Sequence, residues 1–338
     1  MRHAFITGAA GFIGYHLARH LLDQGWRVTG YDGMTDYYDV ALKRARLRQL
    51  DENAAFTFHE AMLEDADRLR HAVLTARPDV IIHLAAQAGV RYSIENPRAY
   101  LDSNIVGSFN LMEPALEVGV KHLLMASTSS VYGANTKMPY AETDKADTQM
   151  SFYAATKKAN EAMAHAWAHI HGLPITMFRF FTVYGPWGRP DMALFKFTKA
   201  ILEGQPIDVY NHGEMWRDFT YVDDLVRGIG LLIDCVPAAP GAGRSGGVAQ
   251  DSLSPVAPWR VVNIGNSNSV RLTDFIEAIE AATGRTAVRN LMDMQPGDVP
   301  ATWADAGVLK ALTGYSPRTD VTEGVARFVA WYRDFYKV

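Results

Sequence analysis

Tyr153 and Lys157 have the residue types and spacing of a proton-transfer pair, because side chains four apart on a helix share a face. A phenol with an unperturbed pKa of about 10 is a poor base. A nearby ammonium group and an oxidised nicotinamide ring would both favour the phenolate, so Tyr153 could then accept a proton near neutral pH. The same spacing also fits a surface tyrosine beside a surface lysine. The hydroxyl cluster Ser127 to Ser130 favours the chemical interpretation.

A glycine loop near the start of the chain indicates a phosphate-binding turn. The segment Thr7 to Gly14 reads TGAAGFIG and contains Gly8, Gly11 and Gly14. Such a loop lets the backbone and a helix N-terminus approach a pyrophosphate. Asp32 follows at the distance of a carboxylate that binds an adenosine ribose and repels a 2'-phosphate, so NAD is expected. Lys43 and Arg44 lie close enough in the sequence to leave NADP open.

The elements that must position these residues alternate between short apolar runs and helix-period segments. Strands are expected at 4–7, 27–31, 56–59, 80–84, 122–126 and 175–179, with helices at 14–24, 65–76, 104–118 and 152–170. This alternation predicts an α/β fold with a Rossmann-type doubly wound parallel sheet.

After Gly185 the regular alternation of strands and helices gives way to turns and mixed short elements, so the chain is expected to form two parts. Residues 1–180 would form the NAD-binding domain, to which later segments return, and 181–338 would form a smaller mixed α/β substrate-binding part. Within the second part, residues 237–258 are rich in Pro, Gly, Ala and Ser and predict an exposed, mobile surface loop.

Composition narrows the classes of function. The 338 residues carry 33 Lys and Arg against 37 Asp and Glu, a formal charge of -4, so no basic field would attract nucleic acid or an anionic membrane. One cysteine, Cys235, cannot form an internal disulfide, and the first residues show no signal-peptide pattern. Long apolar runs are also missing. We therefore expect a cytoplasmic protein.

Taken together, the motifs resemble the extended short-chain dehydrogenase/reductase superfamily and, within it, the NAD-dependent nucleotide-sugar epimerases, most closely the UDP-glucuronate 4-epimerases. The segments that carry the resemblance are TGAAGFIG at 7–14, LAAQAGVRYS at 84–93, STSSVYG at 127–133, YAATKKANE at 153–161, RFFTVYGPWGRPDMA at 179–193 and RDFTYVDD at 217–224. The resemblance covers nearly the whole chain. The resemblance implies interconversion of UDP-glucuronate and UDP-galacturonate through a 4-keto sugar, without decarboxylation.

Site residues follow from the resemblance position by position. It implies catalytic roles for Thr128, Tyr153 and Lys157. Cofactor contacts would come from Gly8, Gly11, Phe12, Ile13, Gly14, Asp32, Lys43, Leu84, Ala85, Ala86 and Asn104, together with Tyr153 and Lys157. Substrate contacts would come from Arg91, Ser129, Ser130, Thr182, Arg189, Arg217 as the diphosphate ligand, and Asp298 at the uridine ribose. One position departs from the family: Met62 stands where relatives usually carry an acid that touches adenine, so weaker NAD retention is expected.

The substrate carboxylate separates two related activities. A 4-keto uronate is a β-keto acid and loses CO2 when the carboxylate bond aligns with the carbonyl, so an epimerase must hold the carboxylate out of that alignment. Arg189, Thr182, Ser129 and Ser130 suit this task, since a guanidinium offers paired donors and hydroxyls fix rotation. Decarboxylases that resemble this chain carry Glu at the position of Ser130, which disfavours that activity. Arg189 also fits a solvated loop arginine.

Two further interpretations stay open. Some proteins of this fold bind a dinucleotide as regulators without catalysis, although Tyr153 and Lys157 are both present here. His165, His169 and His171 have the composition of a metal cluster, but hydride transfer needs no metal and none is expected; a helix surface or subunit contact fits them better. In the family, helices corresponding to 104–118 and 152–170 form a homodimer interface, so a homodimer is expected.

Overall fold

A sheet of seven parallel strands forms the centre of the protein, in the order β10-β6-β5-β4-β1-β2-β3. The computed structural model describes residues 1–241, 251–295 and 298–338. The strands span β1 (His3–Thr7), β2 (Arg27–Asp32), β3 (Phe56–Glu60), β4 (Val80–His83), β5 (His122–Thr128), β6 (Ile175–Phe180) and β10 (Trp259–Ile264). The order reverses between β1 and β4, which confirms the predicted doubly wound fold and places a ligand crevice at that point.

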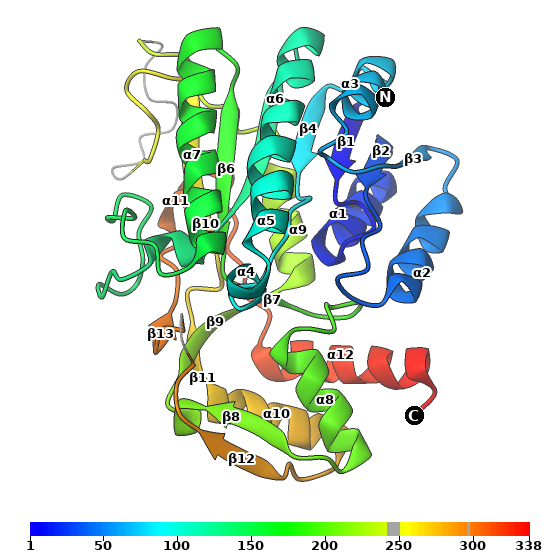
Figure 1. The fold of residues 1–338 in the computed structure, drawn as a ribbon, viewed down its shortest axis with the longest axis vertical. Helices are drawn as coiled ribbons and strands as arrows, with labels where there is room; N and C mark the ends of the chain where they lie inside the picture. The colour runs from blue at the N-terminus through cyan, green and yellow to red at the C-terminus, as the bar shows by residue number, and fades with distance from the viewer. Residues whose placement is uncertain (242–250, 296–297) are drawn as a thin grey trace.

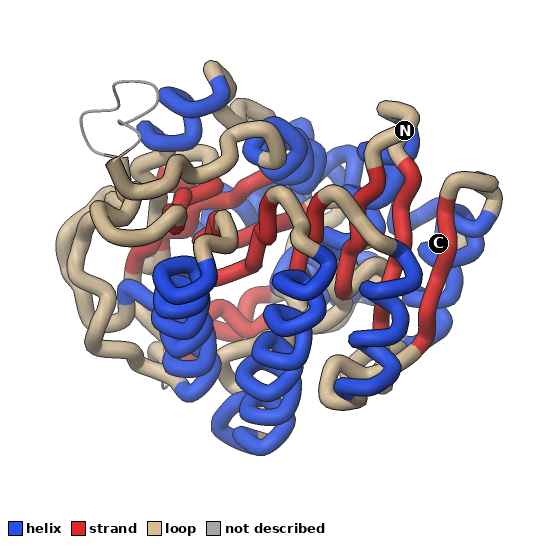
Figure 2. Tube along the Cα trace, turned by 90° about the horizontal axis from the view of Figure 1, so that it is seen from above, coloured by secondary structure: helices blue, strands red, loops and turns tan. Residues whose placement is uncertain are grey.

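Helices cover both faces of this sheet, as the view in Figure 2 shows. Burial on both faces explains why most of its strands are continuous apolar runs. Residues of α1 (Phe12–Asp23), α2 (Val40–Asp51), α9 (Val222–Leu232) and α11 (Gly307–Thr313) share one apolar core with the sheet. Residues of α3 (Ala66–Ala76), α6 (Gly107–Val118) and α7 (Phe152–His171) share the other.

A smaller part of the chain lies beyond the carboxyl ends of the sheet (Figure 1). In it, β9 (Trp216–Tyr221) pairs with β7 (Thr182–Tyr184), β11 (Ser269–Arg271) and β13 (Ala301–Thr302), and β8 (Ile207–Tyr210) pairs with β12 (Arg289–Met292). Its helices are α8 (Ala193–Glu203), α10 (Leu272–Thr283) and α12 (Val321–Tyr336). The rings of Phe219 and Phe275 stack at 3.9 Å in its core.

The connection before α6 is more irregular than the predicted helix 104–118. Two short helices, α4 (Tyr92–Glu95) and α5 (Pro97–Tyr100), precede a π-helical segment, Leu101–Val106, and the α-helix begins only at Gly107. π-Helical turns widen the backbone locally and often occur at functional sites. Here the turn contains the buried Asn104, a predicted cofactor contact.

The segment 237–258 is only partly described, and its described end is not an exposed loop. Residues 242–250 lie outside the described residues. After them, Asp251 forms a buried two-point ion pair with Arg260 of β10, with both N–O distances 2.9 Å. His165 contacts Ser254 at 2.9 Å and His169 contacts the Val256 carbonyl at 2.7 Å. Side chains of α7 therefore hold residues 251–258 against the protein, and two of the three histidines have this structural use.

The described part of the chain contains no helix that is both long and apolar enough to cross a membrane.

Candidate active site

A cavity of about 260 Å³ opens at the carboxyl ends of the central strands, next to the reversal of strand order. It brings together side chains that the sequence singled out on segments far apart in the chain. The predicted residues that line it are Gly8, Gly11, Phe12, Ile13, Gly14, Asp32, Lys43, Leu84, Ala85, Ala86, Thr128, Tyr153, Lys157 and Arg189.

The glycine loop follows β1 and passes directly under the loop after β4. Gly8 has φ +73°, and a Cβ there would lie 2.8 Å from the amide nitrogen of Ala85. A Cβ at Gly14 would overlap the carbonyl oxygen of Gly8. Only glycine tolerates the first conformation and the second contact, so this turn brings bare backbone to the cavity at the N-terminus of α1.

Asp32 ends β2 and accepts hydrogen bonds from the amides of Ala10 at 3.1 Å and Met34 at 2.8 Å. Burial raises the pKa of its carboxyl group, while these amides and the charge of Lys43 oppose that effect. Lys43 also lines the cavity and donates to the Thr35 carbonyl at 2.6 Å. Arg44 instead points to Glu60, with N–O distances of 2.7 and 2.8 Å. The carboxylate of Asp32 in the cavity, with Arg44 paired elsewhere, fits the expected preference for NAD over NADP.

A buried polar chain fixes the loop after β4. The hydroxyl oxygen of Thr7 accepts the amides of Leu84 and Ala85, each at 3.1 Å, so its proton goes to His83 Nδ1 at 2.7 Å. His83 Nε2 then donates to Ser108 at 3.0 Å. Burial lowers the pKa of His83 to about 3, which keeps the ring neutral as this arrangement requires.

Tyr153 and Lys157 lie in the first turns of α7, which Ser151 caps. Burial raises the pKa of Tyr153, and the nearby hydroxyl group of Thr128 and the charge of Arg189 oppose that effect. Burial also lowers the pKa of Lys157 to about 8, and its amine donates to the Ala126 carbonyl at 3.0 Å. A phenolate at Tyr153 therefore needs positive charge in the cavity beyond what these residues supply.

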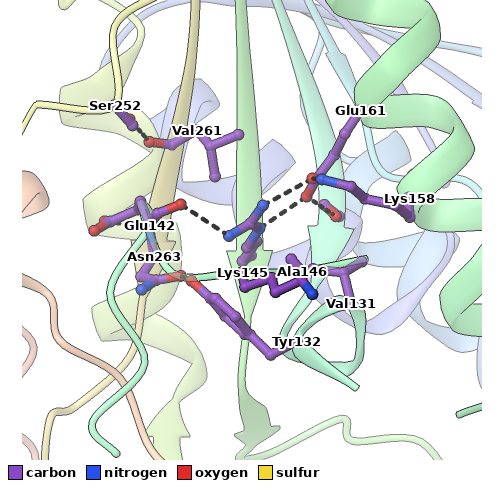
Figure 3. Close-up of polar contacts among 12 residues, drawn as sticks. Val131, Tyr132, Glu142, Lys145, Ala146, Lys158, Glu161, Ser252, Val261 and Asn263 are labelled. Carbon is purple, nitrogen blue, oxygen red and sulfur yellow. Dashed lines mark hydrogen bonds and ion pairs between the residues drawn. The ribbon is translucent and has the colours of Figure 1, made fainter. Parts of the chain in front are cut away.

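A buried ion pair supports the floor of the site. Arg179 of β6 donates to both carboxylate oxygens of Glu161 on α7, each at 2.8 Å, and Ser127 donates to the same carboxylate at 2.7 Å. The guanidinium of Arg179 also donates to the Glu142 carbonyl at 3.2 Å, so it joins Glu142 to Glu161, both labelled in Figure 3. The pair ties the end of β5, one residue before Thr128, to the helix that carries Tyr153.

Arg189 reaches the cavity from the turn that follows β7. Its guanidinium donates to both oxygens of Asp191, at 3.0 and 2.5 Å, and Tyr37 donates to the same carboxylate at 3.3 Å. The carboxylate of Asp191 raises the pKa of Arg189 well above its usual range despite burial. The guanidinium is thus a fixed cation with donors left for a ligand, not a solvated loop arginine.

The other predicted residues lie around the cavity and are not part of its described lining. Asn104 lies behind it and bonds to Gln87 and Thr156. Ser129 and Ser130 begin a short 3-10 helix, Ser129–Tyr132, and Thr182 begins β7 between the lining residues Phe181 and Val183.

At the outer end, Arg91 pairs with Asp298 at 3.2 Å across the gap between the two parts of the chain. Arg217 donates to the carbonyls of Trp216, Val299 and Pro300, at 2.8 to 3.2 Å. The expected diphosphate ligand thus binds backbone here, so a diphosphate would have to displace those contacts or use the remaining donors.

Several lining residues were missed by sequence reasoning. They are Gly33, Thr35, Tyr37, Tyr38, Leu63, Gln87, Ala88, Ser103, Ala126, Phe180, Phe181, Val183 and Met192. Six of them lie in the segments 84–93 and 179–193, which carry the family resemblance, so those segments were one usable signal. The Tyr37-Tyr38 pair shortly after Asp32 was another. Met62, the departure from the family, does line the cavity.

A doubly wound sheet with a glycine loop, an acidic residue at the end of β2 and a Tyr-Lys pair in one cavity defines a dinucleotide-dependent enzyme of the Rossmann class. Residues 4–241 match the NAD dependent epimerase/dehydratase family, and the chain belongs to that family.

Named relatives agree with this assignment. The chain is 56% identical to a probable UDP-glucuronate 4-epimerase of Rhizobium meliloti (strain 1021), with 98% of this chain and 97% of the relative covered. It is 45% identical to UDP-glucuronate 4-epimerase 4 of Arabidopsis thaliana, covering 98% of this chain and 75% of that protein. Among solved structures, the UDP-glucuronic acid 4-epimerase of Bacillus cereus in complex with UDP-glucuronic acid and NAD superposes with a TM-score of 0.87, at 30% identity, covering 99% and 100% of the two chains.

Proposed function

We propose that this enzyme interconverts UDP-glucuronate and UDP-galacturonate by NAD-dependent epimerisation at C4. The observation that carries the proposal is the convergence of Tyr153, Thr128 and Arg189 on the cavity that the glycine loop also lines. The relatives that cover nearly the whole chain carry this activity in their names. In this proposal, residues 1–180 with β10 bind the cofactor and residues 181–338 supply most of the sugar-nucleotide contacts.

The residues present fit NAD. Without side chains, Gly8 and Gly14 let the loop after β4 and the start of α1 pack against the turn through their backbones, and both glycines line the cavity together with Asp32 and Lys43. Phe12, Ile13, Leu84, Ala85 and Ala86 add apolar or backbone surface. When bound, NAD would accept a hydride from C4 of the sugar and return it to the opposite face.

The protein's own groups manage the proton. Tyr153 accepts the proton of the 4-hydroxyl group, and the hydroxyl group of Thr128, which lines the same cavity, binds the sugar oxygen. Lys157 lies on the same helix face as Tyr153 and supplies positive charge there. Its amine can also bind the hydroxyl groups of a ribose. The product of this step is a 4-keto sugar, and inversion follows when the sugar presents its other face.

The keto intermediate of a uronate is prone to lose CO2: the C5–C6 bond breaks, its electron pair enters the C4 carbonyl, and C5 takes a proton from water. We propose that Arg189, Thr182, Ser129 and Ser130 hold the carboxylate away from the alignment that this step requires. A paired guanidinium contact suits a carboxylate. Arg91, Arg217 and Asp298 are proposed to hold the nucleoside diphosphate at the outer end.

We further propose that the enzyme acts as a cytoplasmic homodimer. Leu101, Val106, Phe109 and Ile170 are exposed apolar side chains along the π-helical turn, α6 and α7. The ring of Phe109 packs edge-on against Trp167 at 5.8 Å, which joins the two helices into one surface. An apolar surface of this kind fits a second copy through a shared helix bundle.

Decarboxylation is the second candidate activity, and a non-catalytic dinucleotide-binding regulator is the third. Incubation with UDP-glucuronate followed by mass spectrometry and observation of anomeric proton signals separates them. An isomer of equal mass supports the proposal. Loss of CO2 identifies a decarboxylase, and an unchanged substrate in the presence of bound NAD identifies a binding protein. A parallel screen with neutral UDP-hexoses tests the preference for uronates.

A further inference from the structure

Arg46 of α2 is fully buried, yet its hydrogen bonds go to neutral oxygens. It donates to the Ala10 carbonyl and the Tyr38 hydroxyl, each at 2.9 Å, and to the Trp187 carbonyl at 2.6 Å. Its Nε has no hydrogen-bond partner among the described residues. A fully buried arginine is rare because its desolvation is costly. The cost points to a task that an apolar residue could not perform.

The task is visible in what Arg46 joins. Ala10 belongs to the glycine loop, and Trp187 belongs to the turn between β7 and α8 that carries Arg189. On the neighbouring helix α1, His16 Nε2 lies 2.9 Å from the carbonyl oxygen of Pro186. Two successive carbonyls of the Arg189 turn are therefore held by α1 and α2, which both belong to the cofactor-binding half.

The turn itself needs such support. Trp187 has φ +60°, a left-handed conformation that is costly for a bulky residue. Its ring is fixed by Tyr15 at 5.6 Å, Trp331 at 5.2 Å and Phe335 at 5.0 Å. Arg189 follows two residues later, so the angle at which it enters the cavity depends on this backbone.

We propose that Arg46 and His16 are positioning residues for Arg189, which they set in register with the cofactor-binding loop. The inference rests on the proposed function and deepens it, since it names the residues that make the carboxylate contact accurate enough to suppress decarboxylation. When these carbonyls are released, the turn relaxes and the guanidinium shifts, although Arg189 itself is intact.

The test is the partition of product between UDP-galacturonate, measured by its anomeric proton signal, and decarboxylated UDP-sugar, measured by mass spectrometry, after incubation with UDP-glucuronate. Unfolding lowers both products equally, so a merely structural role leaves their ratio unchanged. Arg46→Gln should raise the decarboxylated fraction about five- to tenfold, since small displacements from productive geometry have large kinetic effects. Arg46→Lys can reach one carbonyl and should fall between Gln and the wild type. Arg48→Gln, on the exposed side of the same helix, is the matched control.

His16→Phe supplies an independent variant, because it keeps the edge-on ring contacts with Phe12 and Tyr15 and removes the donor. His16→Phe should also raise the decarboxylated fraction. If the Arg46 variants do not fold, this variant alone tests whether the turn positions Arg189. A wild-type ratio in a folded, epimerising Arg46→Gln or His16→Phe protein would overturn the inference. A wild-type enzyme that produces no UDP-galacturonate would instead overturn the proposed function, and the inference with it.

Discussion

Asp191 holds Arg189 through both carboxylate oxygens, so the only predicted substrate-binding cation that lines the cavity is already oriented by the protein. The arrangement leaves a defined edge of the guanidinium for an incoming carboxylate. The carboxylate of Asp191 also partly neutralises the positive charge of Arg189, which reduces the desolvation cost of burying that charge.

Replacement of Arg189 by alanine should slow turnover of UDP-glucuronate and increase the share of product that has lost CO2. We expect at least a tenfold loss in kcat/KM, the scale of a lost charged hydrogen bond. Product masses and initial rates check this directly. Arg189→Lys keeps the charge without the paired donors and should be intermediate; unchanged rate and product ratio in Arg189→Ala would rule out the carboxylate contact.

Tyr153→Phe should abolish nearly all epimerisation while NAD remains bound, because the substitution removes the proton acceptor and little else. The fall in kcat should be about a thousandfold or more. HPLC of the denatured protein measures retained NAD. Tyr92→Phe, outside the described cavity lining, serves as the control. Substantial activity in Tyr153→Phe would assign the proton to another group.

The pH dependence of stability should carry the signature of Glu142. Burial raises the pKa of Glu142 from 4.5 to about 7, so the folded state binds more protons than the unfolded state between these values. Stability from this group is present below pH 4.5 and is lost as the pH rises through 7. Glu142→Gln imitates the protonated form. The difference in free energy of unfolding between this variant and the wild type should therefore shift in favour of the variant, by up to about 3 kcal/mol, between pH 4.5 and pH 8. Urea unfolding of both proteins at the two pH values tests this, and a pH-independent difference would contradict it.

Met62 offers a test of cofactor retention. It lines the cavity where family members usually place an acid against adenine, so Met62→Asp should slow the loss of NAD on dilution several-fold. Fluorescence or HPLC of retained nucleotide measures the effect. Because Met62 is partly exposed, the substitution should leave the melting temperature nearly unchanged. An unchanged rate of NAD loss would show that the adenine does not reach this side chain, and faster loss would contradict a favourable contact.

The proposed dimer depends on an apolar surface that a charge should disrupt. Val106 is 41% exposed within it, and Leu231 on α9 is 38% exposed elsewhere. Val106→Lys should convert the protein to monomer in light scattering at micromolar concentration, whereas Leu231→Lys should leave the assembly unchanged. Equal behaviour of the two variants would move the interface to another face.

Sequence reasoning predicted the features that depend on local order along the chain. The Gly8 to Gly14 turn, the Asp32 position and the Tyr153 to Lys157 spacing each follow from one strand or helix, and all enter the cavity. Long-range contacts were less accessible. Nothing in the sequence around Arg46 indicated that it would reach Trp187, and nothing around Arg217 indicated that nearby carbonyls would engage it. The π-helical turn at Leu101–Val106 was likewise hidden, because a π-helix and an α-helix differ by less than one residue per turn and a single turn leaves no distinct pattern in the sequence.

The place of β10 in the main sheet bears on how the protein is made. Its partner β6 is finished at Phe180, but β10 begins only at Trp259, after most of the chain has left the ribosome. Until then β6 presents an open edge that another chain can pair with. A fragment ending near residue 241 would include the whole family match and still lack this strand. Such a fragment would leave β6 as an open edge strand, so we expect it to aggregate more readily than the whole chain.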